Sequence, residues 1–192
     1  MSSFTGPEAA PLFEQYLSAI SRESDRGAVL VAAALLDEGL QVALKRKMVP
    51  ISDGDDPLFD GAYSPLRSFS AKIETAFRLG LITHRTKQML NQFRKLRNDF
   101  AHGANAVSLG EQSVKNRLKE MFEQMPQIQK MILGTFDEVT KAVSEGKYAG
   151  AEVLETPEGR RAFFDTFFAA NAMALRRLES EIETTQELKL PN

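Results

Sequence analysis

The residues best suited to chemistry lie in one short stretch, RKLRNDFAHG, from Arg94 to Gly103. Within it, Arg97, Asn98, Asp99 and His102 place a guanidinium, an amide, a carboxylate and an imidazole within six positions. A histidine can move a proton near neutral pH, and an arginine can stabilise charge that develops on a phosphate. These groups suit cleavage of RNA without a metal, with His102 as general acid or base, Arg97 as phosphate stabiliser, and Asn98 and Asp99 in support.

A helix must present these groups. After Thr83 the apolar residues recur at spacings of four, three and four, which is typical of a helix with one buried side: Met89, Phe93, Leu96 and Phe100. Gly103 is the type of residue found just past a helix end, so His102 is expected at that end. Arg97 and His102 would lie roughly 140° apart around a straight helix. They would converge only if the last turn unwinds or if a second subunit contributes its own copy.

An earlier helix supplies candidate partners for the arginine. The stretch from Arg26 to Met48 is almost continuously apolar, which predicts a central helix, and Asp37 and Glu38 lie on its one narrow polar strip. A carboxylate against a core helix is costly unless it is partnered, so Asp37 or Glu38 is predicted to pair with Arg97. The alternative is that the strip simply faces solvent. In the same way, Arg97, Asn98 and His102 could serve structure alone, as ion-pair, loop and helix-end contacts.

These motifs resemble known families. The spacing from Arg97 to His102 resembles the arginine-to-histidine motif of the HEPN superfamily of helical bundles, many of which are RNA-cutting toxins with composite sites at dimer interfaces. A longer match is similar in order and spacing to the MltR (mannitol operon repressor) family over roughly positions 25 to 180. It comprises LLDEGLQVAL, DPLFDGAYSPLRSFSAKIETAFRLGLI, the arginine helix and PEGRRAFF. This resemblance implies regulation of a sugar-alcohol uptake operon.

Composition limits the possibilities further. The 192 residues are 43% hydrophobic, which suits one globular domain over 1–192 with a short lead at 1–8 and a tail at 186–192. The absence of cysteine excludes disulfides and thiolate zinc sites. The N-terminus lacks a signal-peptide pattern and no segment is expected to span a membrane, so a cytoplasmic location is predicted.

The remaining segments also read as helices. Apolar spacing and helix-start residues predict helices over Pro11 to Arg22, Pro65 to Leu79 with Ser64 as the cap, Ser108 to Gln124, Ile128 to Ser144, and onward from Thr156 and Pro157. Together with the two helices above, they predict an all-α antiparallel bundle of six to seven helices. The loop from Pro50 to Tyr63 carries four aspartates, but their spacing does not match a calcium loop. Leu58 and Phe59 are expected to anchor this loop to the core.

The last predicted helix is unusually aromatic. It carries four phenylalanines within six positions: Phe163, Phe164, Phe167 and Phe168. This exceeds what one buried stripe requires, so some of them are expected to cover a neighbouring helix and others could form a subunit contact.

Direct reading of DNA is not expected. A repressor of that kind needs two short helices with a basic second helix, whereas the best pair, Pro65 to Leu79 and Thr83 to His102, ends in a long helix with a core stripe. The net charge of −2 also argues against a general nucleic-acid coating role. We predict an MltR-like regulatory homodimer that acts through a protein partner, without cofactor or metal. The alternatives are a metal-independent HEPN-type endoribonuclease and a small-molecule-sensing bundle.

Overall fold

The computed structural model describes residues 7–51, 54–102, 108–134 and 156–188. In this part of the chain the α-helices with defined ends are α1 (Ala9–Ser21), α2 (Asp25–Lys47), α3 (Phe69–Arg78), α4 (His84–His102), α5 (Gln112–Gln124) and α8 (Pro157–Arg177). Residues 126–134 are also helical, and the 3-10 turn η2 (Leu178–Ser180) follows α8. The described residues include no strand, which confirms the predicted all-α helical bundle.

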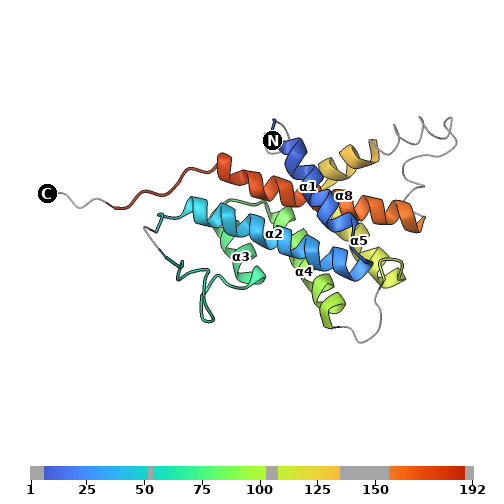
Figure 1. The fold of residues 1–192 in the computed structure, drawn as a ribbon, viewed down its shortest axis with the longest axis horizontal. Helices are drawn as coiled ribbons and strands as arrows, with labels where there is room; N and C mark the ends of the chain where they lie inside the picture. The colour runs from blue at the N-terminus through green and yellow to red at the C-terminus, as the bar shows by residue number, and fades with distance from the viewer. Residues whose placement is uncertain (1–6, 52–53, 103–107, 135–155, 189–192) are drawn as a thin grey trace.

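Helix α2 lies at the centre of the bundle, as predicted. It packs against α1, α3, α4 and α8, whereas α5 packs against α4 (Figure 1). The expectation that no segment is long and apolar enough to span a membrane is wrong for α2, which passes that test by length and composition. Half of its most apolar window is buried inside the bundle, so packing against four helices explains why α2 is so apolar.

A glycine brings α2 and α8 unusually close together. A Cβ atom added at Gly39 would lie 3.0 Å from Cβ of Leu175 and 3.2 Å from the backbone nitrogen of Arg176. Glycine within a helix costs about 1 kcal/mol relative to alanine. Position 39 therefore gives up helix propensity so that the backbones of the two helices can approach.

The four phenylalanines of α8 are all fully buried. The Phe168 ring stacks on Phe93 of α4 with centroids 4.0 Å apart, and Phe122 of α5 lies 4.6 Å from both Phe163 and Phe167. The suggestion that some of these rings form a subunit contact is therefore wrong. Because α8 is covered by α1 and α2 as well as by rings from α4 and α5, aromatic residues are accommodated on several of its sides.

Arg161 fixes the start of α8 to the rest of the bundle. Its guanidinium donates to Asp165 Oδ1 at 2.8 Å, to Asp25 Oδ1 at 3.2 Å, and to the backbone carbonyls of Ile20 and Glu23. Burial raises the pKa of Asp165, and the hydrogen bond from Arg161 opposes that shift. The arginine thereby joins α8 to α2 and to the connection between α1 and α2.

Side-chain caps set several helix starts. Thr156 accepts from the backbone nitrogen of Gly159 at 3.0 Å, and Thr83 accepts from that of Thr86 at 3.1 Å, as expected. The predicted start of α3 at Ser64 is wrong, because Ser68 caps this helix by accepting from Ala71.

The hydroxyl of Ser64 instead donates to the carbonyl of Asp60 at 2.6 Å. This contact belongs to the loop before α3, in which Phe59 is buried and Leu58 is 40% exposed. Of the two predicted anchors, only Phe59 therefore reaches the core. The loop carboxylate Asp56 holds the turn by accepting from the backbone nitrogen of Leu58 at 2.9 Å.

The predicted start of a helix at Ser108 is too early. Glu111 accepts from the backbone nitrogen of Ser108 at 3.1 Å, but α5 begins only at Gln112, later than predicted. The hydroxyl of Ser108 donates to Asp25 at 3.1 Å and so ties the start of α5 to α2. The predicted end of α4 at Gly103 lies outside the described residues, as does most of the helix predicted over Ile128 to Ser144.

Candidate functional site

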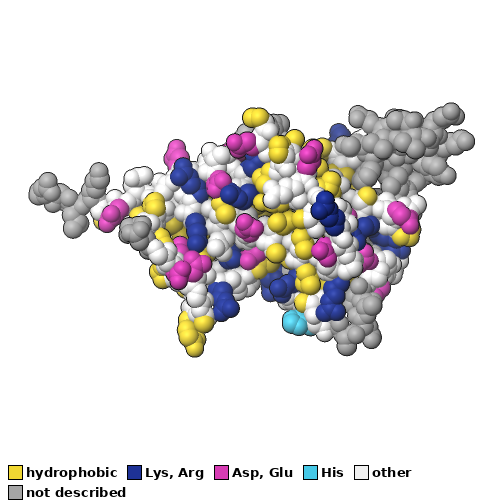
Figure 2. All heavy atoms as spheres, viewed as in Figure 1, with side chains coloured by type: hydrophobic (Ala, Val, Ile, Leu, Met, Phe, Trp, Pro, Cys, Tyr) yellow, Lys and Arg dark blue, Asp and Glu magenta, His cyan; other side chains and the backbone are white. Residues whose placement is uncertain are grey.

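A polar cleft of about 450 Å³ opens between α2, the start of α3 and the second half of α4. We call it the basic cleft, and its lining residues are Leu30, Ala33, Ala34, Asp37, Arg67, Ser68, Phe69, Ser70, Arg94, Arg97 and Asn98. In Figure 2 the molecule is hollowed between the loop before α3 and the end of α4, and lysine or arginine side chains lie beside this hollow. Part of the arginine stretch singled out in the sequence thus lines a real recess.

Two of the four predicted catalytic residues line this cleft. Nη1 of Arg97 donates to Oδ1 of the adjacent Asn98 at 3.2 Å, and the Arg97 side chain is exposed. Because that partner is neutral, the charge of the guanidinium is not offset by it. Arg97 can therefore still attract an anion.

The other two predicted catalytic residues have different surroundings. Asp99 accepts from Nη1 of Arg117 on α5 at 2.6 Å, which makes it a bridge between α4 and α5. His102 is the exposed last residue of α4 and is not among the lining residues of the basic cleft. The carbonyl of Ala101 accepts from Nη2 of Arg26 at 2.7 Å, so an arginine of α2 satisfies this end of α4. Within one subunit the cleft thus contains the arginine without the histidine.

The carboxylates of α2 do not pair with Arg97 in the structure. Asp37 accepts from Nζ of Lys72 at 2.8 Å, and the Lys72 side chain is only 4% exposed. Glu38 is exposed, and its charge adds to burial in raising the pKa of Tyr16 on α1. Lys72 was not singled out in the sequence, although it lies beside the inward-facing Ile73 and four positions before Ala76, which places it near the buried side of α3.

Two buried atoms of the basic cleft lack a hydrogen-bond partner. They are Oδ1 of Asp37 and Nε of Arg94, which account for two of the four such side-chain atoms among the described residues. Leaving a buried donor or acceptor unpaired costs about 1–3 kcal/mol. Arg67 and Ser70 were not predicted because they come from around the start of α3, which only the fold brings beside α4, whereas Arg94 lies in the stretch singled out in the sequence but was given no role there.

An ion-pair group holds α3 against α4 beside the cleft. Glu74 of α3 accepts from Nζ of Lys87 on α4 at 2.5 Å and from Nε of Arg78 at 3.0 Å. The hydrogen bond from Lys87, followed by that from Arg78, lowers the pKa of the Glu74 carboxyl. The Lys87 ammonium also lies 4.4 Å from the centroid of the Phe77 ring.

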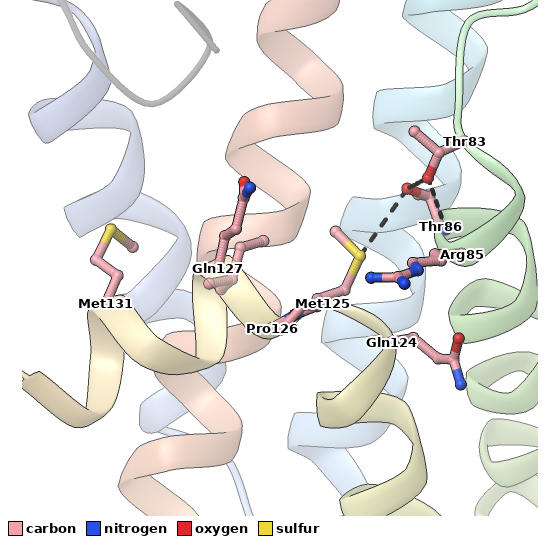
Figure 3. A pocket seen from close by; sticks show the side chains of 9 residues that line it. Thr83, Arg85, Thr86, Gln124, Met125, Pro126, Gln127 and Met131 are labelled. Carbon is pink, nitrogen blue, oxygen red and sulfur yellow. Dashed lines mark hydrogen bonds between the residues drawn. The ribbon is translucent and has the colours of Figure 1, made fainter.

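A second recess, of about 500 Å³, lies at the other end of α4. We call it the apolar groove, and it is lined by Thr83, Arg85, Thr86, Gln124, Met125, Pro126, Gln127, Ile128 and Met131. Figure 3 shows the thioether of Met125 directed toward the hydroxyl of Thr86, with an oxygen-to-sulfur distance of 3.9 Å. Methionine adapts its shape to irregular apolar partners, so this groove is chemically unlike the basic cleft.

Comparison with known proteins identifies a fold relative. Neither protein-family models nor curated protein sequences give a match to this chain. The structure resembles that of MtlR in the X-ray structure of the MtlR-HPr complex from Escherichia coli, with a TM-score of 0.53 and 15% sequence identity. The likeness covers 89% of this chain and 98% of the other. The chain therefore has an MtlR-like fold.

Proposed function

We propose that this protein is a regulatory protein of the mannitol-repressor type, which controls transcription by binding a protein partner. The observation that carries the proposal is the MtlR-like fold, which spans nearly the whole of a protein whose structure was solved in complex with HPr. It agrees with the family resemblance in the ordered sequence segments. We take HPr, or a protein of its kind, as the partner.

The shape of α4 supports action through a partner rather than through DNA. This helix is 19 residues long, and its core side buries Met89, Leu90, Phe93, Leu96 and Phe100. A recognition helix must expose one face to the major groove and present base-reading side chains there. The chain also has a net charge of −2, so it has no excess of lysine and arginine with which to bind the DNA phosphates.

The partner surface that we favour is the apolar groove. Its methionine and proline side chains are apolar, and Met131 is 49% exposed. Protein interfaces are enriched in methionine at their centres, and an adaptable apolar recess can accept an apolar side chain of a partner.

Calorimetry with HPr from the organism that encodes this protein tests the proposal. We expect binding with a dissociation constant below about 100 µM, within the range of transient signalling complexes. Met131→Asp should weaken binding at least about tenfold, because a carboxylate would be buried against apolar surface. Val49→Asp, a control at an apolar residue that is 44% exposed and outside the groove, should leave it unchanged.

The outcomes test separately whether HPr is the partner and whether the apolar groove is the surface that binds it. No detectable heat at 100 µM of both proteins, about the limit set above, would reject HPr as the partner. Equal loss in both variants would reject the groove as the surface. The proposed homodimer is measured in the same samples by light scattering, and a monomeric mass would reject it.

A second candidate is a HEPN-type endoribonuclease. The observation that favours it is the exposed guanidinium of Arg97 in a cleft shared with Arg94 and Asn98, where a phosphate could bind. His102 would have to come from a partner subunit or from a rearranged helix end. Wild-type protein should then cut total RNA in the presence of EDTA, whereas Arg97→Ala and His102→Ala should not. Cutting that survives in either variant would reject this candidate.

A further inference from the structure

The basic cleft carries positive charge that the protein itself does not neutralise. Arg67, Arg94 and Arg97 line it, and no ion pair between described residues includes any of these three arginines. Asp37 is the one carboxylate in the lining, and Lys72 offsets it at 2.8 Å. A recess whose walls concentrate one sign of charge attracts ligands of the opposite sign.

The charged groups of the lining indicate what such a ligand must offer. Nε of Arg94 and Oδ1 of Asp37 are themselves buried, so a ligand would meet the rest of each group: the Arg94 guanidinium needs a hydrogen-bond acceptor, whereas the Asp37 carboxylate, whose side chain is 32% exposed, needs a donor. An acceptor that is also anionic gains most from a guanidinium, because charge-assisted hydrogen bonds are roughly twice as strong as neutral ones. A neutral donor, such as a hydroxyl group, suits Asp37, because Lys72 already balances its charge.

The start of α3 adds a further donor on the same side. Ser68 and Ser70 carry hydroxyl groups in the lining that are hydrogen-bonded to each other at 3.2 Å, which leaves one hydroxyl proton for a ligand, and Ser68 caps the helix. The N-terminal end of a helix carries partial positive charge and favours an anion. The partial positive charge at the start of α3 therefore adds to the positive charge of the arginines in attracting an anion.

The rest of the lining is suited to a small organic molecule. Leu30, Ala33, Ala34 and Phe69 provide apolar contact on the α2 and α3 sides. A volume of about 450 Å³ lies within the range of small-molecule sites in proteins, roughly 300–1,000 Å³. The cleft is therefore larger than an inorganic anion requires.

We propose that the basic cleft binds a small hydroxylated organic anion. Its phosphate or carboxylate group contacts Arg94 and Arg97, and one of its hydroxyl groups donates to Asp37. The site is distinct from the apolar groove, so it goes beyond the proposed binding of a protein partner. Failure of one proposal leaves the other standing.

Titration of the full chain by NMR with small probes tests this site. The probes are glycerol 2-phosphate, glycerate, methyl phosphate and glycerol, which separate the contributions of the phosphate, the carboxylate and the hydroxyl group. We expect glycerol 2-phosphate or glycerate to bind and to shift amides of α3 and of the second half of α4. Methyl phosphate should bind more weakly than glycerol 2-phosphate, and glycerol should not bind.

Arginine variants on the same helix provide matched controls. Arg94→Gln and Arg97→Gln should each weaken binding of the best probe about tenfold, the loss of one charge-assisted contact. Arg85→Gln removes the same charge from α4, but within the apolar groove, and should leave the affinity for this probe unchanged. Arg97 is exposed, so its variant is expected to fold normally even if Arg94→Gln does not.

Several results would overturn the proposal. They are the absence of binding by both hydroxylated anions, equal weakening by Arg85→Gln, and unchanged affinity in Arg97→Gln. Methyl phosphate that binds as tightly as glycerol 2-phosphate would overturn the role given to Asp37. Binding of only one of the two hydroxylated anions, glycerol 2-phosphate or glycerate, supports the site and identifies phosphate or carboxylate as the group that it recognises.

Discussion

The basic cleft and the apolar groove lie along one helix, α4, but differ in their lining: three arginines line the cleft and one lines the groove, whereas two methionines and a proline line only the groove. At the start of α4, the capping residue Thr83 and the helix residues Arg85 and Thr86 line a groove completed by methionine, proline, isoleucine and glutamine. Near its end, α4 contributes Arg94, Arg97 and Asn98 to a cleft completed by a helix N-terminus. The difference comes partly from α4 itself, which supplies two of the three arginines, and partly from the neighbours that pack against each half of it.

The two recesses also differ in how their polar groups are satisfied. In the apolar groove the Thr86 hydroxyl contacts both Thr83 and Met125. In the basic cleft buried polar atoms of Asp37 and Arg94 have no protein partner. Because proteins rarely leave such atoms unpaired, the comparison favours the basic cleft for polar ligands and the apolar groove for a protein surface.

The largest expected effect is a loss of stability that should disturb both recesses, because it comes from the middle of α4. Phe93 is fully buried and stacks on Phe168, so it anchors the middle of α4 to α8. Phe93→Ala should lower the free energy of unfolding by about 3–5 kcal/mol, through lost contact and a cavity. Urea unfolding measures the change, and Gln88→Ala, at an exposed position of α4, is the control. A loss under about 1 kcal/mol would show that α4 does not depend on this stacking.

The second variant should disturb the basic cleft without disturbing the apolar groove. Lys72→Met leaves Asp37 without its ion-pair partner, and the Asp37 side chain is 32% exposed. Removal of one partner of a fully buried pair costs about 3–5 kcal/mol, so partial exposure should reduce the loss to about 2 kcal/mol. Urea unfolding measures the loss, and amide chemical shifts should change around the basic cleft but not around the apolar groove.

Two further variants check the cause of that loss. Lys95→Met, at an exposed position of α4, should change the free energy of unfolding by no more than about 0.5 kcal/mol. The double variant Lys72→Met with Asp37→Leu should recover most of the stability, because the uncompensated charge is gone. No recovery in the double variant would contradict the ion-pair explanation.

The smallest effect concerns pH and the contact between α3 and α4. Hydrogen bonds from Lys87 and Arg78 lower the pKa of Glu74 below its ordinary value of 4.5. A carboxyl group with a lowered pKa in the folded state stabilises that state above pH 4.5. This contribution is lost as the pH falls through the folded-state pKa.

A comparison of thermal midpoints at neutral pH and near pH 3 measures this effect, since the lower pH lies beneath the ordinary Glu74 value. Glu74→Gln should lose less stability than wild type on acidification, because its side chain does not titrate. Glu158→Gln, at an exposed position on α8, should behave like wild type. Equal acid sensitivity of wild type and Glu74→Gln would contradict the assignment.

Apolar spacing predicted the helices well because a bundle buries one side of each helix. The spacing of Met89, Phe93, Leu96 and Phe100 identified the buried side of α4, and all four are buried. Helix starts were less predictable where several hydroxyl residues compete. Ser64 and Ser68 are both suitable caps, and the loop contact of Ser64 with Asp60 decided in favour of Ser68.

The candidate site was predicted only in part. Arg97 and Asn98 come from the stretch singled out in the sequence, and they do line the basic cleft. The partner of Asp37 was missed because a lysine on an amphipathic helix usually faces solvent, whereas Lys72 is drawn inward by a carboxylate 35 positions earlier in the chain. Sequence spacing describes one helix at a time, so contacts between helices are beyond its reach.

Gly39 determines how wide the interior of this bundle can be. Because Gly39 carries a hydrogen atom where alanine has a methyl group, the backbone of α2 can pack directly against Leu175 and the backbone of α8; these are the two longest of the helices described. A Cβ at this position would lie 3.0 Å from Leu175 and 3.2 Å from the backbone of Arg176, so α8 would have to give by a few tenths of an ångström. A single methyl group on α2 would therefore disturb the helix that carries the four buried phenylalanines.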